Sequence, residues 1–105
     1  MRTEITLHTQ DRRPLLGETS HPTPLGAKVL QSVADCCDRL GQPLLEADLA
    51  SDRLVFQLEG APSLPQLRRL LLLLRQTTTP FHETGDNAGY CAVLWQRQPV
   101  IQTLP

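Results

Sequence analysis

The stretch "RRLLLLLRQ", residues 68–76, places five consecutive leucines between arginines. A run of five apolar residues is far shorter than the roughly 20 that a membrane-spanning helix needs, which excludes a membrane segment here. On a helical wheel the leucines instead form one stripe roughly 120° wide, enough to cover a sheet. The members of this stripe are Leu64, Leu67, Leu70, Leu71 and Leu74.

Two leucines of the run fall outside this stripe. Leu73 lies just beside it, and Leu72 lies on the far side of the wheel among the arginines. Isolated leucines on a protein surface are common and need no special explanation. The alternative is that they contact another chain, with the arginines as the polar rim of that contact. Both interpretations remain open from the sequence.

Capping residues delimit two predicted helices. Ser63 and Gln66, three residues apart, have the spacing of a capping box and predict a helix that runs to about Thr77. The segment "TPLGAKVLQSVADCCDRLGQP", residues 23–43, predicts the other helix, in which Thr23 suits the N-cap and Gly41 the C-terminal cap. Its apolar residues recur on one side, so this helix should also pack on a sheet.

Alternating apolar and polar residues predict the strands. Residues 3–9 read as one strand. The stretch "PLLEADLASDRLVFQLEG", residues 43–60, reads as a hairpin that turns at 50–52, with Leu45, Ala47 and Leu49 on one face of its first strand. The apolar segment "AGYCAVLWQ", residues 88–96, reads as the last strand. The segment "VIQTLP", residues 100–105, is either a continuation of that strand past Pro99 or a loose tail, and we assign 99–105 as a C-terminal tail.

This order of elements predicts a single α+β domain over residues 1–105. The economical arrangement for β-α-β-β-α-β is a ferredoxin-like two-layer sandwich, with a four-stranded antiparallel sheet and two helices on one face. The first and third strands are expected at the centre, parallel to each other. Residues 10–22 should form a loop, and residues 77–89 a mobile loop.

Charge and composition predict no nucleic-acid partner. Ten basic against eleven acidic residues give a formal net charge of -1, which creates no positive field. The predicted open face of the sheet also has no aromatic residue on which a base could stack. Its expected members are Thr6, His8, Val55 and Gln57.

The N-terminal segment and the cysteines predict a cytoplasmic protein. The stretch "MRTEITLHTQ" has no apolar core of the kind that a secretory signal has. Three cysteines, an odd number with two adjacent, form no disulfide framework and indicate reduced thiols. Cys36 and Cys37 fall on the apolar side of their helix, where we expect them to pack as small hydrophobic residues. We predict no catalytic residue, no metal and no cofactor.

Residues 77–90 form the most polar segment of the chain and supply the candidate ligand site. They contain His82, Glu83, Asp86 and Tyr90, which could bind a small molecule or serve as acid and base. No H-E-x-x-H motif accompanies them, so a dedicated metal site is not indicated.

The predicted last strand is apolar on both faces, whereas a sheet covered on one side should have polar residues on the other. Cys91, Val93 and Trp95 would need a cover, and together with Leu72 and Leu73 they form the predicted oligomer interface. The sequence therefore favours a non-enzymatic interaction or regulatory module that acts as a homo-oligomer, most simply a dimer. A further protein partner is a possible addition. The alternative is a small-molecule or metal-binding domain, or a minor enzyme, that uses the 77–90 loop.

Overall fold

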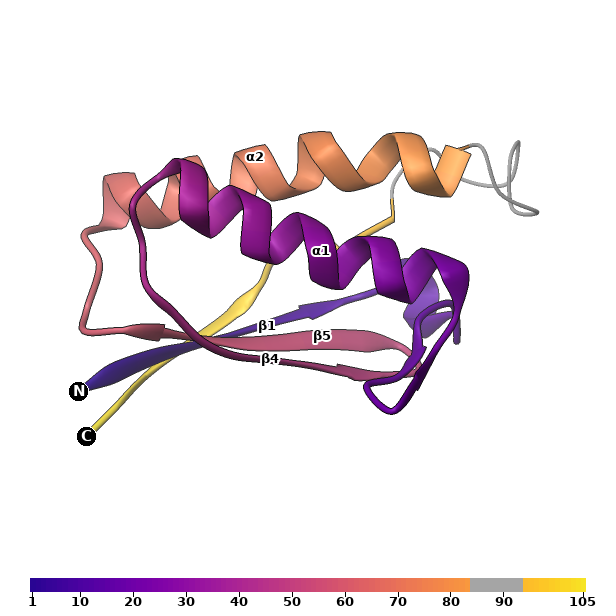
Figure 1. Ribbon diagram of the computed structural model, residues 1–105, viewed down its shortest axis with the longest axis horizontal. Coiled ribbons are helices and arrows are strands. Elements are labelled where there is room, and N and C mark those ends of the chain that lie inside the picture. Colours follow the sequence, from indigo (N-terminus) through magenta and orange to yellow (C-terminus); the bar gives the residue numbers. More distant parts are fainter. Residues whose placement is uncertain (84–93) are drawn as a thin grey trace.

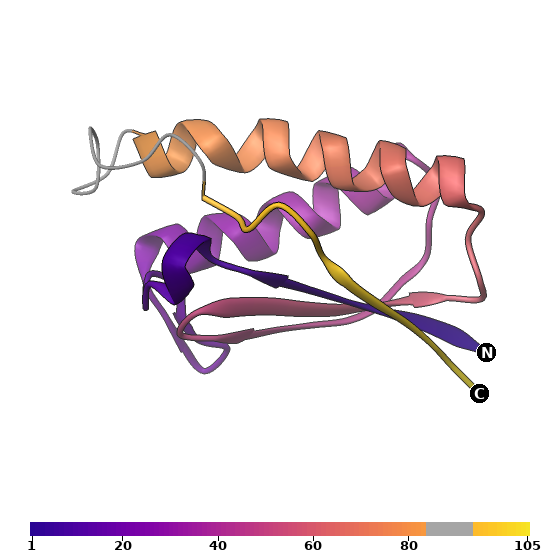
Figure 2. The same cartoon turned by 180° about the vertical axis from the view of Figure 1, so that it is seen from behind.

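A computed structural model of the chain describes residues 1–83 and 94–105. Two helices, α1 (Pro24–Arg39) and α2 (Leu64–Glu83), lie side by side over one face of a four-stranded antiparallel sheet (Figure 1). No element of the described residues covers the opposite face, as the view from behind also shows (Figure 2). The predicted two-layer α+β sandwich is confirmed. Neither helix in these two ranges is long and apolar enough to cross a membrane.

The sheet has the strand order β4-β5-β1-β6. Its strands are β1 (Arg2–His8), β4 (Leu44–Ala50), β5 (Arg53–Glu59) and β6 (Val100–Leu104). The first and third strands of the prediction, β1 and β5, are central as expected, but they are antiparallel rather than parallel. The physical reason is the hairpin: α1 returns the chain so that β4 runs in the direction of β1, and the tight β4–β5 turn then reverses it.

The fourth strand is not where the sequence predicted it. β6 pairs with β1 along its whole length, from Thr6 opposite Val100 to Arg2 opposite Leu104, so the prediction of a C-terminal tail is wrong. Most of the predicted strand at 88–96 lies outside the described residues, and its described part makes only one isolated bridge, between Thr9 and Trp95. A five-residue strand gains its stability from long-range pairing, which a local pattern does not reveal.

Both predicted helix stripes form the core between the layers. The residues of α1 that face the sheet are buried or half-buried, and Leu67, Leu70 and Leu74 of α2 are buried against the same cluster. Leu64 is the exception in the predicted stripe, because it is the first residue of α2 and is 55% exposed. In β4 a bulge between Leu44 and Glu46 turns Leu44 towards the helices and leaves Leu45 51% exposed. A regular alternation of Leu45 with Ala47 and Leu49 predicts Leu45 on the inner face instead, and the bulge makes that expectation wrong.

The 10–22 segment is held against the start of α1 by Leu16. It contains a 3-10 turn (Gln10–Arg12) and two short paired strands, β2 (Gly17–Glu18) and β3 (His21–Pro22). Leu16 is fully buried, and its carbonyl accepts a hydrogen bond from the Thr23 N–H at 3.0 Å. The Thr23 hydroxyl caps α1 by accepting from the Gly26 N–H at 3.0 Å and donates to the Leu15 carbonyl at 2.7 Å. Close contact of loop and helix at this point requires Gly26.

We expect Gly26→Ala to destabilise the domain strongly, because the added Cβ would lie 2.0 Å from the Leu16 carbonyl oxygen. Backbone on both sides cannot move away cheaply, so the loss in the free energy of unfolding should be about 3 kcal/mol, the upper part of the range for overpacking. The control is Gly41→Ala, where no atom lies within 4 Å and only the left-handed φ of +65° opposes a side chain. It should cost about 1 kcal/mol in chemical denaturation. Equal losses in the two variants would contradict the close-contact argument.

Helix α2 continues past the predicted end at Thr77 to Glu83. The first seven residues of the predicted 77–90 loop are therefore helical, in spite of Pro80, which lowers helix stability by removing a backbone donor. A tertiary contact favours the extension: Thr78 is fully buried, and its hydroxyl accepts a hydrogen bond from the Trp95 indole N–H at 2.9 Å. Local propensity could not reveal this contact.

Candidate functional site

The open face of the sheet is hollowed over the two central strands. The hollow has a volume of about 310 Å³ and is lined by Glu4, Thr6, His8, Arg53, Val55 and Val100. His8 and Arg53 are directly opposite each other across β1 and β5, which puts their side chains on the same face. The His8 Nδ1 atom is buried and has no hydrogen-bond partner among the described residues. Because His8 and Arg53 lie side by side in it, the hollow is a candidate binding site.

Charge on the open face is mixed. Arg53 is exposed, and its guanidinium can donate two parallel hydrogen bonds to a carboxylate or phosphate. Glu4 lines the same hollow, and Glu46 and Asp48 of β4 are exposed on the same side of the sheet. The hollow therefore suits a single anionic group held by Arg53 and His8 better than a long polyanion bound by charge alone.

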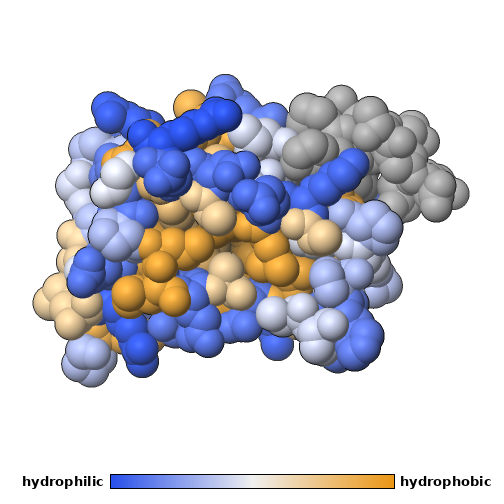
Figure 3. Space-filling view, in the orientation of Figure 1, coloured by the Kyte–Doolittle hydropathy of each residue, from blue (hydrophilic) through white to orange (hydrophobic). Residues whose placement is uncertain are grey.

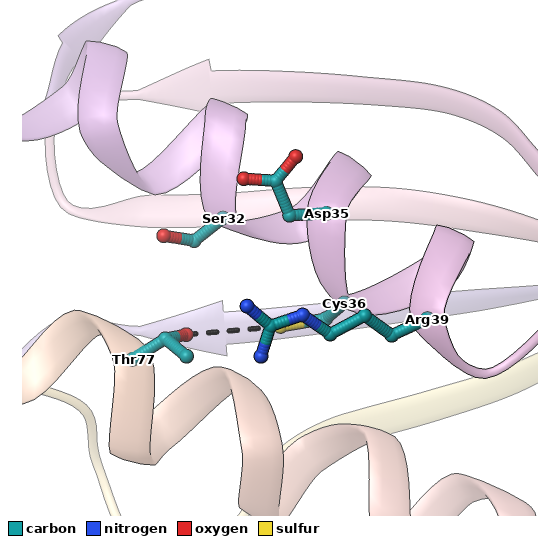
Figure 4. Close-up of a pocket in the computed structure, with 5 residues that line it drawn as sticks. All are labelled: Ser32, Asp35, Cys36, Arg39 and Thr77. Carbon is teal, nitrogen blue, oxygen red and sulfur yellow. Dashed lines mark hydrogen bonds between the residues drawn. The ribbon is translucent and has the colours of Figure 1, made fainter.

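A second cavity, of about 260 Å³, lies between the two helices (Figure 4). Ser32, Asp35, Cys36 and Arg39 of α1 line it together with Thr77 of α2. Arg39 extends along the cavity towards Thr77, whose hydroxyl lies 3.7 Å from the Cys36 thiol. Asp35 already accepts a hydrogen bond from the Gln31 side chain at 3.0 Å. This arrangement is a polar gap between packed helices, and Cys36 at its base is only 1% exposed.

The two adjacent cysteines are free thiols in the core, as predicted. Burial, with a smaller effect of the neighbouring Cys36, raises the pKa of the Cys37 thiol to about 11. The thiolate is the reactive form, so this thiol is inert near neutral pH. Across residues 1–83 and 94–105, no three His, Cys, Asp or Glu side chains are grouped so that they could hold a metal.

We expect Cys36 and Cys37 to react slowly with a maleimide in the native protein at neutral pH and rapidly after unfolding. Labelling should be measured in a Cys91→Ser background, which leaves only these two thiols. Because the folded pKa of Cys37 is above that of a free thiol, native labelling should stay slow until the pH approaches 11. Complete labelling of the native protein within minutes at pH 7 would show that these thiols are accessible.

The predicted ligand residues are only partly placed. His82 and Glu83 belong to the last turn of α2, and nothing is described of their side chains. Asp86 and Tyr90 lie outside the described residues. The grouping of these four side chains therefore stays a prediction. The open-face hollow, which the sequence analysis did not propose, was signalled only by the predicted position of Thr6, His8 and Val55 on one face.

The predicted interface residues separate in the structure. Leu72 is 58% exposed on the outer side of α2, whereas Leu73 is half-buried against the core. Trp95 is 1% exposed, so its assignment to an intermolecular surface is wrong: the cover that it needed is α2 of the same chain. Cys91 and Val93 lie outside the described residues. β6, which the sequence pattern did not single out as an interface, exposes Val100 by 47% and Ile101 by 40%.

An apolar area also covers the flank between α1 and β4 (Figure 3). Leu30 of α1 and Leu44 and Ala47 of β4 are half-buried apolar residues there. A groove of about 250 Å³ at one end is lined by Ala34, Cys37, Asp38, Gln42, Pro43 and Leu44. The domain thus has two sheet edges with apolar surroundings, β4 and β6.

The chain resembles a solved structure but matches no known protein family. No model of a known protein family matches the chain, and no curated protein matches it. Among solved structures, a protein described as a "putative transposase" from Deinococcus radiodurans R1 superposes with a TM-score of 0.74. It is 14% identical, and the match covers 100% of this chain and 79% of that one. At this identity the likeness establishes the shared fold.

This likeness corrects one expectation from the sequence. The prediction of no nucleic-acid partner is wrong as an exclusion, because a protein of the same fold is described as a transposase. Net charge describes the whole chain, and it does not exclude a local contact such as the one that Arg53 and His8 could make.

Proposed function

We propose that this domain is a non-enzymatic interaction module that works as a homodimer. The observation that carries the proposal is the edge strand β6: its outer side has no partner among the described residues, and all five of its residues are uncharged. Unpaired strand edges recruit other strands, and natural proteins usually protect them with charges, prolines or covering elements. Within β6 there is neither a charge nor a proline, and Pro99 and Pro105 only adjoin its ends, so the strand itself lacks this protection.

Exposed apolar side chains support the same proposal. Val100 and Ile101 lie on β6, and Leu72 lies on α2 beside exposed arginines. An apolar centre with a polar rim is the usual anatomy of a protein–protein contact. Leu72, with the half-buried Leu73 beside it, is therefore the alternative to β6 as the centre of the dimer contact. A cytoplasmic location belongs to this proposal, and the free thiols of Cys36 and Cys37 are consistent with it.

The test is sedimentation velocity over a concentration series. The monomer mass is 11.7 kDa, and a homodimer should move towards twice that mass as the concentration rises. Size-exclusion chromatography with light scattering would check the result independently. A protein that remains at the monomer mass up to the highest soluble concentration would overturn the proposal.

A second candidate function is contact with nucleic acid through the open-face hollow. It is favoured by the position of His8 and Arg53 side by side in one hollow. It is supported by the common fold with the Deinococcus protein. Phosphate groups are the natural ligands for such an arginine. Among the described residues no Phe, Tyr or Trp side chain lies on the open face, which argues against base stacking there.

For this candidate we expect the protein to bind a fluorescently labelled single-stranded or hairpin DNA at low salt in an anisotropy titration. Arg53→Gln should weaken that binding about tenfold, as loss of one strong phosphate contact does. Arg39→Gln, an arginine on α1 at the other face, is the matched control and should change the affinity less than twofold. Equal effects of both changes would point to diffuse charge attraction, and no binding by the wild type would exclude the function.

A further inference from the structure

We propose that the occupant of the β6 edge is a second copy of this chain, paired strand to strand about a twofold axis at Gln102. The inference rests on the proposed homodimer and adds which surface forms it and in which register. It excludes both the α1–β4 flank and Leu72 as the centre of the contact.

The hydrogen bonds of β1 show which residues of β6 point their N–H and C=O groups towards β1 and which point them outward. The His8 carbonyl accepts from the Gln96 N–H, whereas the Thr9 N–H donates to the Asp52 carbonyl on the other side. Successive residues of β1 therefore face β6 and β5 alternately, and the even-numbered residues face β6. Opposite them, Val100, Gln102 and Leu104 direct their backbone groups to β1.

Ile101 and Thr103 consequently turn their backbone groups outward. Each has one N–H and one C=O on the free edge, which makes four groups with no partner in residues 1–83 and 94–105. Antiparallel pairing centred on Gln102 sets Ile101 opposite the partner's Thr103 and Thr103 opposite the partner's Ile101. In this register every outward N–H and C=O of the strand finds its complement.

The side chains fit the same register. Val100 would lie beside the partner's Leu104, and Gln102 beside the partner's Gln102, so no charge faces another charge across the seam. Pro99 and Pro105, which have no N–H, adjoin the two ends of the strand and would end the ladder there. An uncharged, exposed edge strand of this kind is what pairs with another copy of itself.

The β4 edge differs from β6 in two ways: one of its outward backbone groups already has a partner, and its side chains are charged. The Leu49 N–H already donates to the Thr19 hydroxyl at 2.8 Å. Pairing of β4 with its own copy about Ala47, the middle of the strand, would set Glu46 opposite the partner's Asp48, and like charges in opposite positions destabilise a strand pair. The apolar flank of Figure 3 is therefore not the self-association surface.

The resulting dimer would have one continuous eight-stranded sheet. A twofold axis perpendicular to the sheet keeps all four helices on one face and both open-face hollows on the other. The β6–β6 seam would lie between the two hollows. The dimer would therefore present two equivalent sites for an anionic group on one surface.

Disulfide trapping tests the register. In a Cys91→Ser background, Gln102→Cys should form a covalent dimer under mild oxidation, because a residue on the axis faces its own copy with Cα atoms about 4.5 Å apart, within disulfide range. Val100→Cys is the matched control on the same strand. Its copy lies four residues away along the partner strand, about 13 Å, so it should not crosslink. Crosslinking at Val100 but not at Gln102 would overturn the register.

A backbone change tests the surface without relying on crosslinks. Thr103→Pro removes an outward N–H that β1 does not use, so the domain should stay folded by circular dichroism while its dimer dissociation constant rises at least tenfold. Leu72→Glu, on the exposed side of α2, should leave the dimer unchanged. A wild-type dimer that survives Thr103→Pro and is lost in Leu72→Glu would overturn this inference and leave the homodimer standing. A wild type that is monomeric throughout would overturn both.

Discussion

A hydrogen bond from the Trp95 indole to Thr78 holds the segment before β6 against α2 and so positions the last strand. Trp95 is the only tryptophan of the chain and is 1% exposed, so its N–H needs an acceptor within the protein. The Thr78 hydroxyl accepts it at 2.9 Å and donates in turn to the Leu74 carbonyl at 2.8 Å. This contact fixes the chain before β6 against α2, and the backbone bridge from Trp95 to Thr9 fixes it against β1. The chain then enters β6 along the edge of β1.

A polar junction at Thr9 completes this placement from the other side of β1. The fully buried Thr9 hydroxyl donates to the Arg13 carbonyl at 2.7 Å, and the Arg12 guanidinium contacts the Asp52 carboxylate at 3.0 Å. The hydrogen bond from Arg12 lowers the pKa of Asp52 below its usual value. Because the folded pKa is lower than the unfolded one, this pair stabilises the domain at neutral pH, and its contribution is lost as the pH falls through the folded pKa. Asp11 and Arg12 both have positive φ, so this junction maintains a backbone that is unfavourable on its own.

Both proposed functional surfaces lie away from the helices, one on the uncovered face of the sheet and one at its β6 edge. The helices cover one side of the sheet, and Cys36 and Cys37 are buried in the core between the two layers. The uncovered face of the sheet presents the hollow with His8 and Arg53, and the adjoining edge presents β6. Self-association through an edge and ligand contact through a face do not compete for the same residues, apart from Val100, which adjoins both. A dimer with nucleic-acid contact is therefore physically consistent.

Periodicity and capping residues were enough to predict the two helices and the points at which they begin. Thr23 and Ser63 cap the two helices as expected, and the stripes of both helices form the core. These features depend on residues close together in the chain, which is why a pattern reveals them. The predicted capping box does not close, however. The Gln66 side chain donates to the Leu40 carbonyl at the C-cap of α1, at 3.2 Å, rather than pairing with the Ser63 backbone.

Three features could not be predicted from local patterns: the position of the last strand, the length of α2 and the set of residues that form the open-face hollow. Each of these depends on contacts between residues far apart in the chain: β6 on pairing with β1, the end of α2 on Trp95, and the hollow on the register of His8 with Arg53. Five uncharged residues between prolines have no period long enough to be distinguished from a tail. They become a strand because β1 offers an unpaired edge, and hydrogen bonds across that edge exist only once the chain has folded.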